Sequence, residues 1–425
     1  MKTYEAYKES GIDWMGVIPT DWDLLKIGRT FSNIGSGTTP KSTDRKYYDN
    51  GEINWLNTGD LNDDFIYSTK KKITHYATEN NSTLRLHPKN SVVIALYGAT
   101  IGKLGYLKIE CTTNQACCVL SNADKVTQRF LFYYFLGARE FIISKSYGGG
   151  QPNISQELIK QLYIASPSLK EQTQIANYLD YNTQIIDTLI EKKEQLIKKI
   201  QAQRQAIINE AVTKGLNPNA KMKASGIEWL GEIPEHWQVV KLRFLADITT
   251  GSKDTENKEI NGKFPFFVRS QTIEQISSYT FEGEAILTAG DGVGVCKVWH
   301  YINDKFDFHQ RVYMMSNFKQ VTGKYLFHFL KENFVHEVLK LSAKSTVDSL
   351  RRPMFLNFPV AVPPLKEQNK IVENVTNSID LIDKSIIKIT SQIKKLKSYR
   401  QSIISEAVTG KIDVRDWKPK TTQNV

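Results

Sequence analysis

An internal repeat constrains the fold of this 425-residue chain more than any other feature of its sequence. The segment GIDWMGVIPTDW at residues 11–22 returns as GIEWLGEIPEHW at residues 226–237. Two further segments occur twice in the same order: PSLKEQTQI from Pro167 returns from Pro363 as PPLKEQNKI, and RQAIINEAVTKG from Arg204 returns from Arg400 as RQSIISEAVTGK. The chain therefore contains two copies of a two-part unit.

The second part of each unit predicts a long helix. Neither proline nor glycine occurs between Pro167 and Gly215, or between Pro364 and Gly410. Each stretch exceeds forty residues, so each helix would be at least about 60 Å long at 1.5 Å per residue. Apolar residues at alternating four- and three-residue spacing favour a coiled-coil seam. The residues expected in this seam are Ile175, Leu179, Ile186, Leu189, Leu196, Ile200, Ile379, Ile382, Ile386, Ile389, Ile393 and Leu396.

Two arrangements of these helices are open. They could pack separately, each on its own domain, or they could pair with each other. We favour pairing, because a solitary helix of this length cannot bury a long, narrow apolar stripe.

The first part of each unit predicts an α+β domain. Short apolar runs such as SVVIALYG from Ser91 and EAILTAG from Glu284 lie between glycine, asparagine and aspartate turns and indicate strands, and a helical stretch follows them in each unit. The tryptophan-containing repeat occurs once per domain, so we interpret it as a structural element that caps or enters the domain; the alternative is a direct ligand contact. The expected division is a first domain at 1–166, a long helix at 167–215, a second domain at 216–362, a second long helix at 363–412 and a C-terminal tail at 413–425.

Composition favours a nucleic-acid partner. The net charge is +11 and the sequence pI is about 9.1, and lysine and arginine displace counterions from phosphates; the alternative is a basic protein that binds no nucleic acid. The four cysteines form no CxxC pair, which predicts reduced thiols and no metal site. No signal peptide or membrane span is recognisable, so we expect a cytoplasmic protein.

Enzyme motifs are incomplete in this sequence. GATIGK at residues 98–103 resembles a phosphate-binding loop, but it is one residue short, and Leu104 follows where Ser or Thr is needed. Glu256 and Lys258 could be half of a nuclease site, but a tripeptide of this kind is common. We therefore expect no catalytic residues and predict a binding function.

Polar loops in both domains supply candidate DNA contacts. Glutamine and asparagine suit adenine, lysine and arginine suit guanine, and cations with glycine amides hold phosphates. For each residue alone, the alternative is a solvated loop. The candidates are Thr38, Thr39, Lys41, Arg45, Lys46, Thr100, Lys103, Asn114, Gln115, Gln151 and Asn153 in the first domain, and Lys253, Arg269, Lys297, Gln310, Arg311, Lys344, Ser345 and Thr346 in the second.

The paired GIxWxGxIPxxW openings, the PxLKEQ helix starts and the RQxIIxEAVT helix ends resemble the specificity subunit of bacterial and archaeal type I restriction-modification systems. The resemblance covers nearly the whole chain. It implies two target-recognition domains, and two helices that pack antiparallel in a pseudo-twofold arrangement. It also implies that each domain reads one half of an asymmetric, bipartite double-stranded DNA site, and that helix length sets the unread spacer.

The same resemblance places the chemistry on other subunits. Two methyltransferase subunits would carry S-adenosylmethionine, and motor-nuclease restriction subunits would join for cleavage, so this chain would be non-catalytic and would bind no cofactor itself. Two other classes stay open from the residues alone. One is a DNA-binding regulator that works without enzyme partners, and the other is a solitary nuclease.

Overall fold

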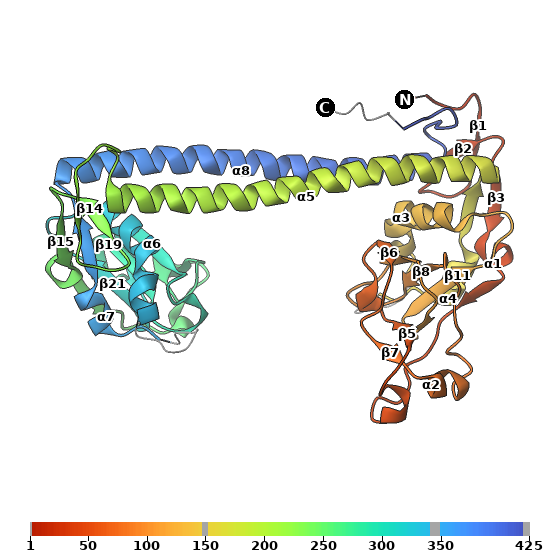
Figure 1. The fold of residues 1–425 in the computed structure, drawn as a ribbon, viewed down its shortest axis with the longest axis horizontal. Coiled ribbons are helices and arrows are strands. Elements are labelled where there is room, and N and C mark those ends of the chain that lie inside the picture. Colours follow the sequence, from red (N-terminus) through yellow and green to blue (C-terminus); the bar gives the residue numbers. More distant parts are fainter. Residues whose placement is uncertain (1, 147–151, 341–348, 420–425) are drawn as a thin grey trace. The chain divides into compact units, whose positions relative to one another are not determined.

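The computed structural model describes residues 2–146, 152–340 and 349–419, and the chain forms two compact units (Figure 1). Unit 1 contains residues 1–193 and 391–425, and unit 2 contains residues 194–390. The division falls inside both long helices, α5 (Leu169–Lys214) and α8 (Leu365–Val408). Each unit therefore consists of one globular domain and one half of each long helix.

A five-stranded mixed sheet forms the centre of the first domain. Its order is β4 (Asn33–Gly35), β11 (Cys117–Ser121), β8 (Val92–Ala95), β9 (Leu104–Leu107) and β6 (Asp64–Ile66). Neighbouring strands are antiparallel except for β6 and β9, which are parallel. A smaller sheet has the order β10 (Thr112–Thr113), β5 (Ile53–Leu56) and β7 (Lys72–Ile73).

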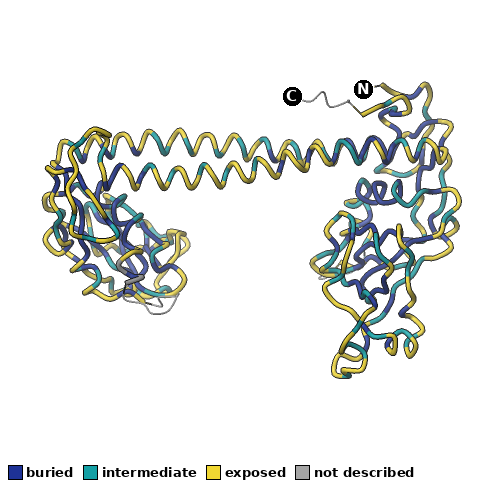
Figure 2. The backbone as a smooth tube through the Cα atoms, viewed as in Figure 1, coloured by how far each residue is buried: buried dark blue, intermediate teal, exposed yellow. Residues whose placement is uncertain are grey.

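Four helices accompany these sheets: α1 (Ile27–Thr30), α2 (His75–Glu79), α3 (Gln128–Ser144) and α4 (Gln156–Gln161). Helix α3 begins where Thr127 accepts a hydrogen bond from the Phe130 N–H group, and most of its aromatic side chains are buried. The dark blue segments of Figure 2 show this core. Cys111, Cys117 and Cys118 are unpaired and buried, and burial raises the pKa of the Cys111 thiol to about 12, so it is not a reactive thiolate.

The second domain repeats the four antiparallel strands β4, β11, β8 and β9 of the first domain within a six-stranded mixed sheet. Its order is β16 (Asp247–Thr250), β21 (Val312–Ser316), β19 (Phe281–Ala289), β20 (Trp299–Phe308), β17 (Phe264–Phe267) and β18 (Glu274–Ile276). The helices α6 (Gly323–Lys340) and α7 (Arg352–Asn357) follow. In the first domain, β11 lies between β4 and β8 and pairs with both. In the second domain, β21 lies between β16 and β19 in the same way. The predicted α+β class is therefore confirmed.

Two small pairs of strands attach each domain to the long helices. In unit 1, β1 (Tyr7–Glu9) pairs with β2 (Val17–Pro19), and β3 (Asp23–Lys26) pairs with β12 (Tyr163–Ser166). In unit 2, β13 (Met222–Ala224) pairs with β14 (Glu232–Pro234), and β15 (Gln238–Lys241) pairs with β22 (Pro359–Val362). The strands β12 and β22 lead directly into α5 and α8.

The repeated tryptophan segment contacts both a helix start and a helix end. Trp22 is 1% exposed and donates a hydrogen bond from Nε1 to Glu171 Oε1 over 3.2 Å. Gly410, which follows α8 at a positive φ of 70°, lies so close that a Cβ atom there would be 3.3 Å from the Trp22 ring. Gly215 holds the equivalent place beside the buried Trp237 in unit 2. The segment is thus part of the scaffold that joins each domain to the helices.

The long helices pair antiparallel in both units. In unit 1, Arg400 Nε donates to Asp187 Oδ1 over 2.9 Å, and Lys193 Nζ donates to Gln392 Oε1 over 2.7 Å. The residue numbers of the partners on α8 therefore decrease as those on α5 increase. In unit 2, the ion pair of Arg204 Nε with Asp383 Oδ1, at 3.5 Å, continues the same direction.

The expected seam needs correction at two positions. Leu189 and Leu196 are 42% and 44% exposed, whereas the neighbouring Ile190 is 9% exposed. A spacing of three residues after Ile186 predicts Leu189, but a spacing of four reaches Ile190 and keeps the buried stripe on one face of α5. The stripe then continues through the half-buried Lys193. The other expected positions lie buried or half-buried: Ile175, Leu179, Ile186, Ile200, Ile379, Ile382, Ile386, Ile389, Ile393 and Leu396.

Candidate nucleic-acid interface

In the first domain, the predicted contact loops leave one edge of the central sheet. Strands β4 and β8 end at this edge, and β9 and β11 begin there, because these neighbours are antiparallel. The loops at residues 36–46, 96–103 and 114–116 therefore meet. Most of the first-domain candidates lie on these three loops: Thr38, Thr39, Lys41, Arg45, Lys46, Thr100, Lys103, Asn114 and Gln115.

Direct contacts lock two of these loops together. The Gly37 N–H group donates to Thr113 Oγ1 over 2.9 Å, and a Cβ atom on Gly37 would lie 1.8 Å from the Thr113 carbonyl oxygen. The Thr39 hydroxyl donates to Gln115 Oε1 over 2.7 Å. Glycine is therefore required at position 37 for the close approach that places Thr39 beside Gln115.

An asparagine pair extends this cluster. Asn114 Nδ2 donates to Asn57 Oδ1 over 3.2 Å, and Asn114 Oδ1 accepts from the Ala116 N–H group over 3.1 Å. Asn57 was not among the predicted contacts. Its position directly after the apolar run of β5 is the only signal in the sequence that could have indicated it.

Cationic side chains surround the first-domain cluster. Lys41 and Lys103 are exposed, as are Arg45 and Lys46 in the short helix η1 (Arg45–Tyr47). Within the part of the chain that the structure describes, no carboxylate lies within ion-pair distance of these four residues. They are free to meet an external anion such as a phosphate group. Asn153 is exposed, and its backbone bridges to Tyr97 of the 96–103 loop.

The second domain presents equivalent loops at the same edge of its sheet. Strands β16 and β19 end where β20 and β21 begin, which brings together the loops at residues 251–258, 290–298 and 309–311. Lys253, Lys297, Gln310 and Arg311 lie on these loops, and Arg269 follows β17. Gln151, Lys344, Ser345 and Thr346 lie outside the described residues.

Two aspartates bind three of the second-domain candidates. Asp291 accepts from Arg269 Nη1 over 3.0 Å and lies 3.3 Å from Arg311 Nη1. Asp254 Oδ2 accepts from Gln310 Nε2 over 2.7 Å. Sequence reasoning missed both aspartates, because a carboxylate repels phosphates and only the folded loops place each aspartate beside the groups that it holds.

The buried His309 side chain also belongs to this cluster. It is 2% exposed, and its Nδ1 atom accepts from the Arg311 N–H group over 2.8 Å. Burial, aided by the nearby Arg269, lowers the pKa of His309 below its usual 6.5, so the ring is neutral at pH 7. A hydrogen-bond acceptor at Nδ1 requires the ring proton on Nε2, which lies 3.8 Å from Asp254 Oδ1.

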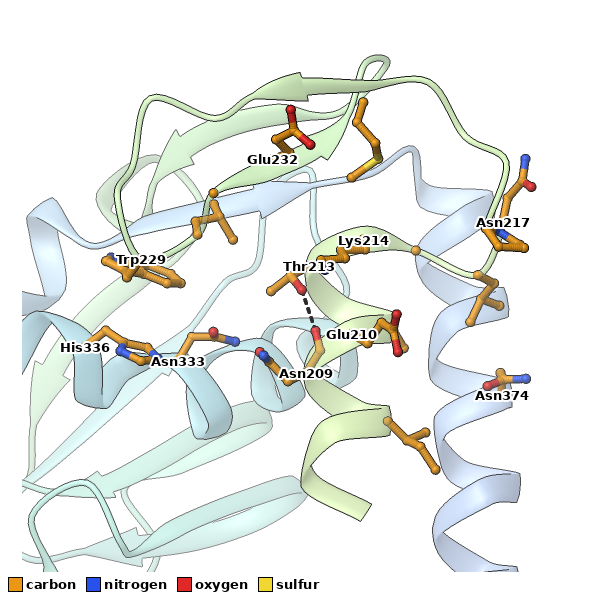
Figure 3. Close-up of a pocket in the computed structure, with 18 of the residues that line it drawn as sticks. Asn209, Glu210, Thr213, Lys214, Asn217, Trp229, Glu232, Asn333, His336 and Asn374 are labelled. Atoms are coloured by element: carbon orange, nitrogen blue, oxygen red, sulfur yellow. Dashed lines mark hydrogen bonds between the residues drawn. The ribbon is translucent and has the colours of Figure 1, made fainter. Parts of the chain in front are cut away.

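Unit 2 also contains a cleft of about 970 Å³ at the end of α5 (Figure 3). Trp229 stacks on His336 there with ring centroids 5.3 Å apart, and Thr213 Oγ1 donates to the Asn209 carbonyl oxygen over 2.7 Å. None of the described DNA-contact candidates lines this cleft. It belongs to the junction between helix and domain rather than to the loop edge.

Neither a metal site nor a membrane span is found in residues 2–146, 152–340 and 349–419. No group of three or more His, Cys, Asp or Glu side chains there could hold a metal ion. None of the helices in those ranges is both long enough and apolar enough to cross a membrane.

Known proteins resemble this chain over nearly its whole length or over part of it. The MjaVIII type I restriction enzyme specificity subunit of Methanocaldococcus jannaschii is 27% identical over 445 aligned residues, which cover 97% of this chain and 98% of that protein. The EcoDI specificity subunit of Escherichia coli is 26% identical over 44% of this chain and 41% of its own.

Solved structures share the fold. A chain from a study of complex assembly and conformational transition of the type I R-M system superimposes with a TM-score of 0.72 at 16% identity, covering 93% of this chain and 99% of that one. The HsdS subunit of Thermoanaerobacter tengcongensis has a TM-score of 0.52 at 16% identity, covering 93% of this chain and 98% of its own.

The family model described as the type I restriction modification DNA specificity domain matches residues 19–199 and again 234–395. Each match begins within the tryptophan segment, spans one domain and extends into the long helix that follows it. Together the two matches cover well over half of the chain. The chain therefore belongs to the family of type I restriction-modification DNA specificity proteins, with two tandem copies of the specificity domain.

Proposed function

We propose that this chain is the non-catalytic, DNA-reading subunit of a type I restriction-modification enzyme. Each domain reads one half of an asymmetric, bipartite site in double-stranded DNA through the loop edge of its sheet. The observation that carries the proposal is the equivalence of the two loop edges combined with their different residues. Asn114 in one edge corresponds to His309 in the other, and Gln115 is held by Thr39 whereas Gln310 is held by Asp254. Equivalent scaffolds with different contact residues suit two different half-sites.

The paired helices set the length of the unread spacer in this proposal. Helix α5 contains 46 residues, which corresponds to about 70 Å at 1.5 Å per residue. Antiparallel pairing along both halves makes the helices stiffer than a single helix. A fixed spacing between two readers then selects a fixed number of base pairs between the half-sites.

Partner subunits supply the chemistry. Two methyltransferase subunits would dock on this chain and bind S-adenosylmethionine, and restriction subunits would join for cleavage. The relatives are specificity subunits of type I restriction enzymes, which supports an assembly of this chain with enzyme subunits. The DNA-contact candidates of this chain would place a target adenine within reach of a partner's active site, which must extract the base from the duplex.

The test is genome-wide adenine methylation, read by single-molecule sequencing in cells with and without this gene. We expect one bipartite motif to lose its methyl groups when the gene is deleted. In cells that carry Gln115→Ala, recognition should relax in one half-site only, and Gln310→Ala should relax only the other. Equal loss in both half-sites from either variant would contradict the modular assignment.

A further inference from the structure

Equivalent turns in the two domains each present one exposed glutamine. The residue before each glutamine accepts a hydrogen bond from the backbone N–H group of the residue after it. Ala116 N donates to Asn114 Oδ1 over 3.1 Å, and Arg311 N donates to His309 Nδ1 over 2.8 Å. The two turns are therefore built alike. The neighbours that hold the two glutamine amides are different.

The amide of Gln310 is held in one orientation. Its Nε2 atom lies 2.7 Å from Asp254 Oδ2. An ionised carboxylate only accepts hydrogen bonds, so the nitrogen of the amide must face Asp254 and the carbonyl oxygen Oε1 must face away. The Gln310 backbone N–H group also donates to the Lys253 carbonyl oxygen over 2.8 Å, which fixes the base of the side chain.

Asp254 is itself held in place. Its Oδ1 atom accepts from the Thr255 N–H group over 2.6 Å, and its own N–H group donates to Asn257 Oδ1 over 2.7 Å. These bonds form the start of the short helix η4 (Thr255–Asn257). The nearby arginines pair with Asp291 instead, which leaves the second oxygen of Asp254 for Gln310.

The glutamine of the first domain lacks this constraint. Its partner is the Thr39 hydroxyl, at 2.7 Å from Gln115 Oε1. A hydroxyl can either donate or accept, so it tolerates both orientations of the Gln115 amide. The two domains thus contain a matched pair of glutamines, and only Gln310 has a fixed amide.

We propose that Asp254 is a positioning residue that turns the carbonyl oxygen of Gln310 toward DNA, so that the second domain selects a base with an exocyclic amine. In the major groove adenine and cytosine present such an amine, whereas guanine and thymine present carbonyl oxygens at the corresponding place. The inference rests on the proposed function, because it requires the loop edge of the second domain to contact bases.

The experiment compares the full chain with Asp254→Asn, each assembled with its methyltransferase subunits. The target motif is first read by methylation sequencing, and methylation is then measured on DNA with every single-base substitution in that motif. We expect Asp254→Asn to reduce discrimination between adenine or cytosine and guanine or thymine by about tenfold or more at one base pair of the second half-site. An asparagine at position 254 that keeps its oxygen on the Thr255 N–H group turns its NH2 group toward Gln310, so the orientation that the carboxylate sets is lost.

Matched variants separate positioning from folding. Glu256→Gln removes the same charge at an exposed position two residues away, within η4, and should leave the preference at every base pair unchanged. Asp254→Glu keeps a carboxylate and should restore discrimination in part. The midpoint of thermal unfolding should change little in all three variants, because Asp254 and Glu256 are both exposed and η4 is a single short turn.

Three outcomes would overturn the proposal. Asp254→Asn could keep the wild-type preference at every base pair, which would make Asp254 a structural residue only. Gln310→Ala could leave the preference unchanged, which would show that Gln310 reads no base. If no methylated motif depends on the chain at all, the proposed function fails and the inference fails with it, and this result is distinct from the first two.

Discussion

At the scale of single residues, a buried glutamine joins each domain to the helix that follows it. Gln172 and Gln368 are each 0% exposed at the start of α5 and α8. Gln172 Oε1 accepts from the Thr127 N–H group over 2.7 Å, and its Nε2 atom donates to the Lys125 carbonyl oxygen over 2.8 Å. Gln368 makes the equivalent bond to Thr322 N over 2.8 Å. One side chain thereby fixes the start of the long helix against the start of α3 or α6.

Replacement of this glutamine should destabilise the domain. Gln172→Ala leaves the buried Thr127 N–H group without its acceptor and removes one donor from the Lys125 and Pro167 carbonyl oxygens, which the Ser166 hydroxyl can satisfy only one at a time. Each buried group left unpaired costs about 1–3 kcal/mol. We expect the free energy of unfolding, measured by denaturant titration, to fall by at least about 2 kcal/mol. Gln203→Ala, at an exposed position of the same helix, is the control and should change it by less than about 0.5 kcal/mol.

A cation at the loop edge should act on binding rather than on stability. Lys41 is exposed beside the Thr39–Gln115 cluster, where a phosphate contact is expected. Lys41→Ala should weaken binding to all DNA sequences and reduce the slope of log K against log salt concentration by about 0.9. Fluorescence anisotropy over a salt series measures this slope. Lys89→Ala, exposed at the opposite edge of the sheet before β8, should leave it unchanged; equal slopes for both variants would remove Lys41 from the interface.

The sequence offers candidates for the contact residues, but it does not indicate which residues hold those candidates in place. Gln115 and Gln310 could be selected because base-reading side chains are few and both stand in polar loops. Asp254 and Asp291 could not, because their role depends on loops that the sheet brings together from distant parts of the chain. Local patterns carry no information on such distances. Whether each candidate meets a base or a phosphate stays a prediction.

At the scale of elements, the long helices show how far periodicity predicts packing. The absence of proline and glycine predicts both helices closely, with ends at Lys214 and Val408. The seam of α8 contains an apolar residue at each four- or three-residue interval, so the spacing alone predicts it. The seam of α5 passes through Lys193 and Arg204, which form polar contacts across the helix pair. A pattern of apolar residues alone therefore predicts Leu189 and Leu196, each one residue away from the buried face of α5.

Alanine substitutions at two adjacent positions test the corrected seam. Ile190 is 9% exposed and Leu189 is 42% exposed on the same turn of α5. Ile190→Ala should reduce the free energy of unfolding by about 2–4 kcal/mol because it leaves a cavity between the helices. Leu189→Ala should reduce it by less than about 1 kcal/mol. The two variants are compared by denaturant titration under one condition, and a larger loss from Leu189→Ala would restore the original seam.

At the scale of the whole molecule, duplication within one chain explains the layout. A symmetric dimer would read two identical half-sites. Here each copy of the domain has its own loops, so Asn114 of the first corresponds to His309 of the second without disturbing the turn that each side chain closes. The scaffold packing, by contrast, is repeated: Gln172 and Gln368 are both fully buried, and Trp22 and Trp237 are each buried beside a glycine that follows a long helix. The two copies thus differ at the loop edge and agree where each domain meets the helices.

The separation of scaffold from loops predicts that spacing and base choice can change independently. One heptad is added to each helix, after Lys193 in α5 and after Thr390 in α8, positions that face each other through the contact of Lys193 with Gln392. Seven residues preserve the seam and lengthen each helix by about 10.5 Å. At 3.4 Å per base pair, the spacer of the methylated motif should grow by about three base pairs. Both half-sites should stay unchanged.

Methylation sequencing of cells that carry only the lengthened chain measures the new motif directly. Insertion of the heptad into α5 alone is the matched control. It leaves seven residues without partners on α8, so the pairing shifts or bulges, and methylation of both the original and the lengthened motif should fall. If the chain with both insertions still methylates the original motif, the helices do not set the spacer. The separation of the half-sites would then have to come from the docked methyltransferase subunits, and the paired helices would act only as the scaffold on which those subunits assemble.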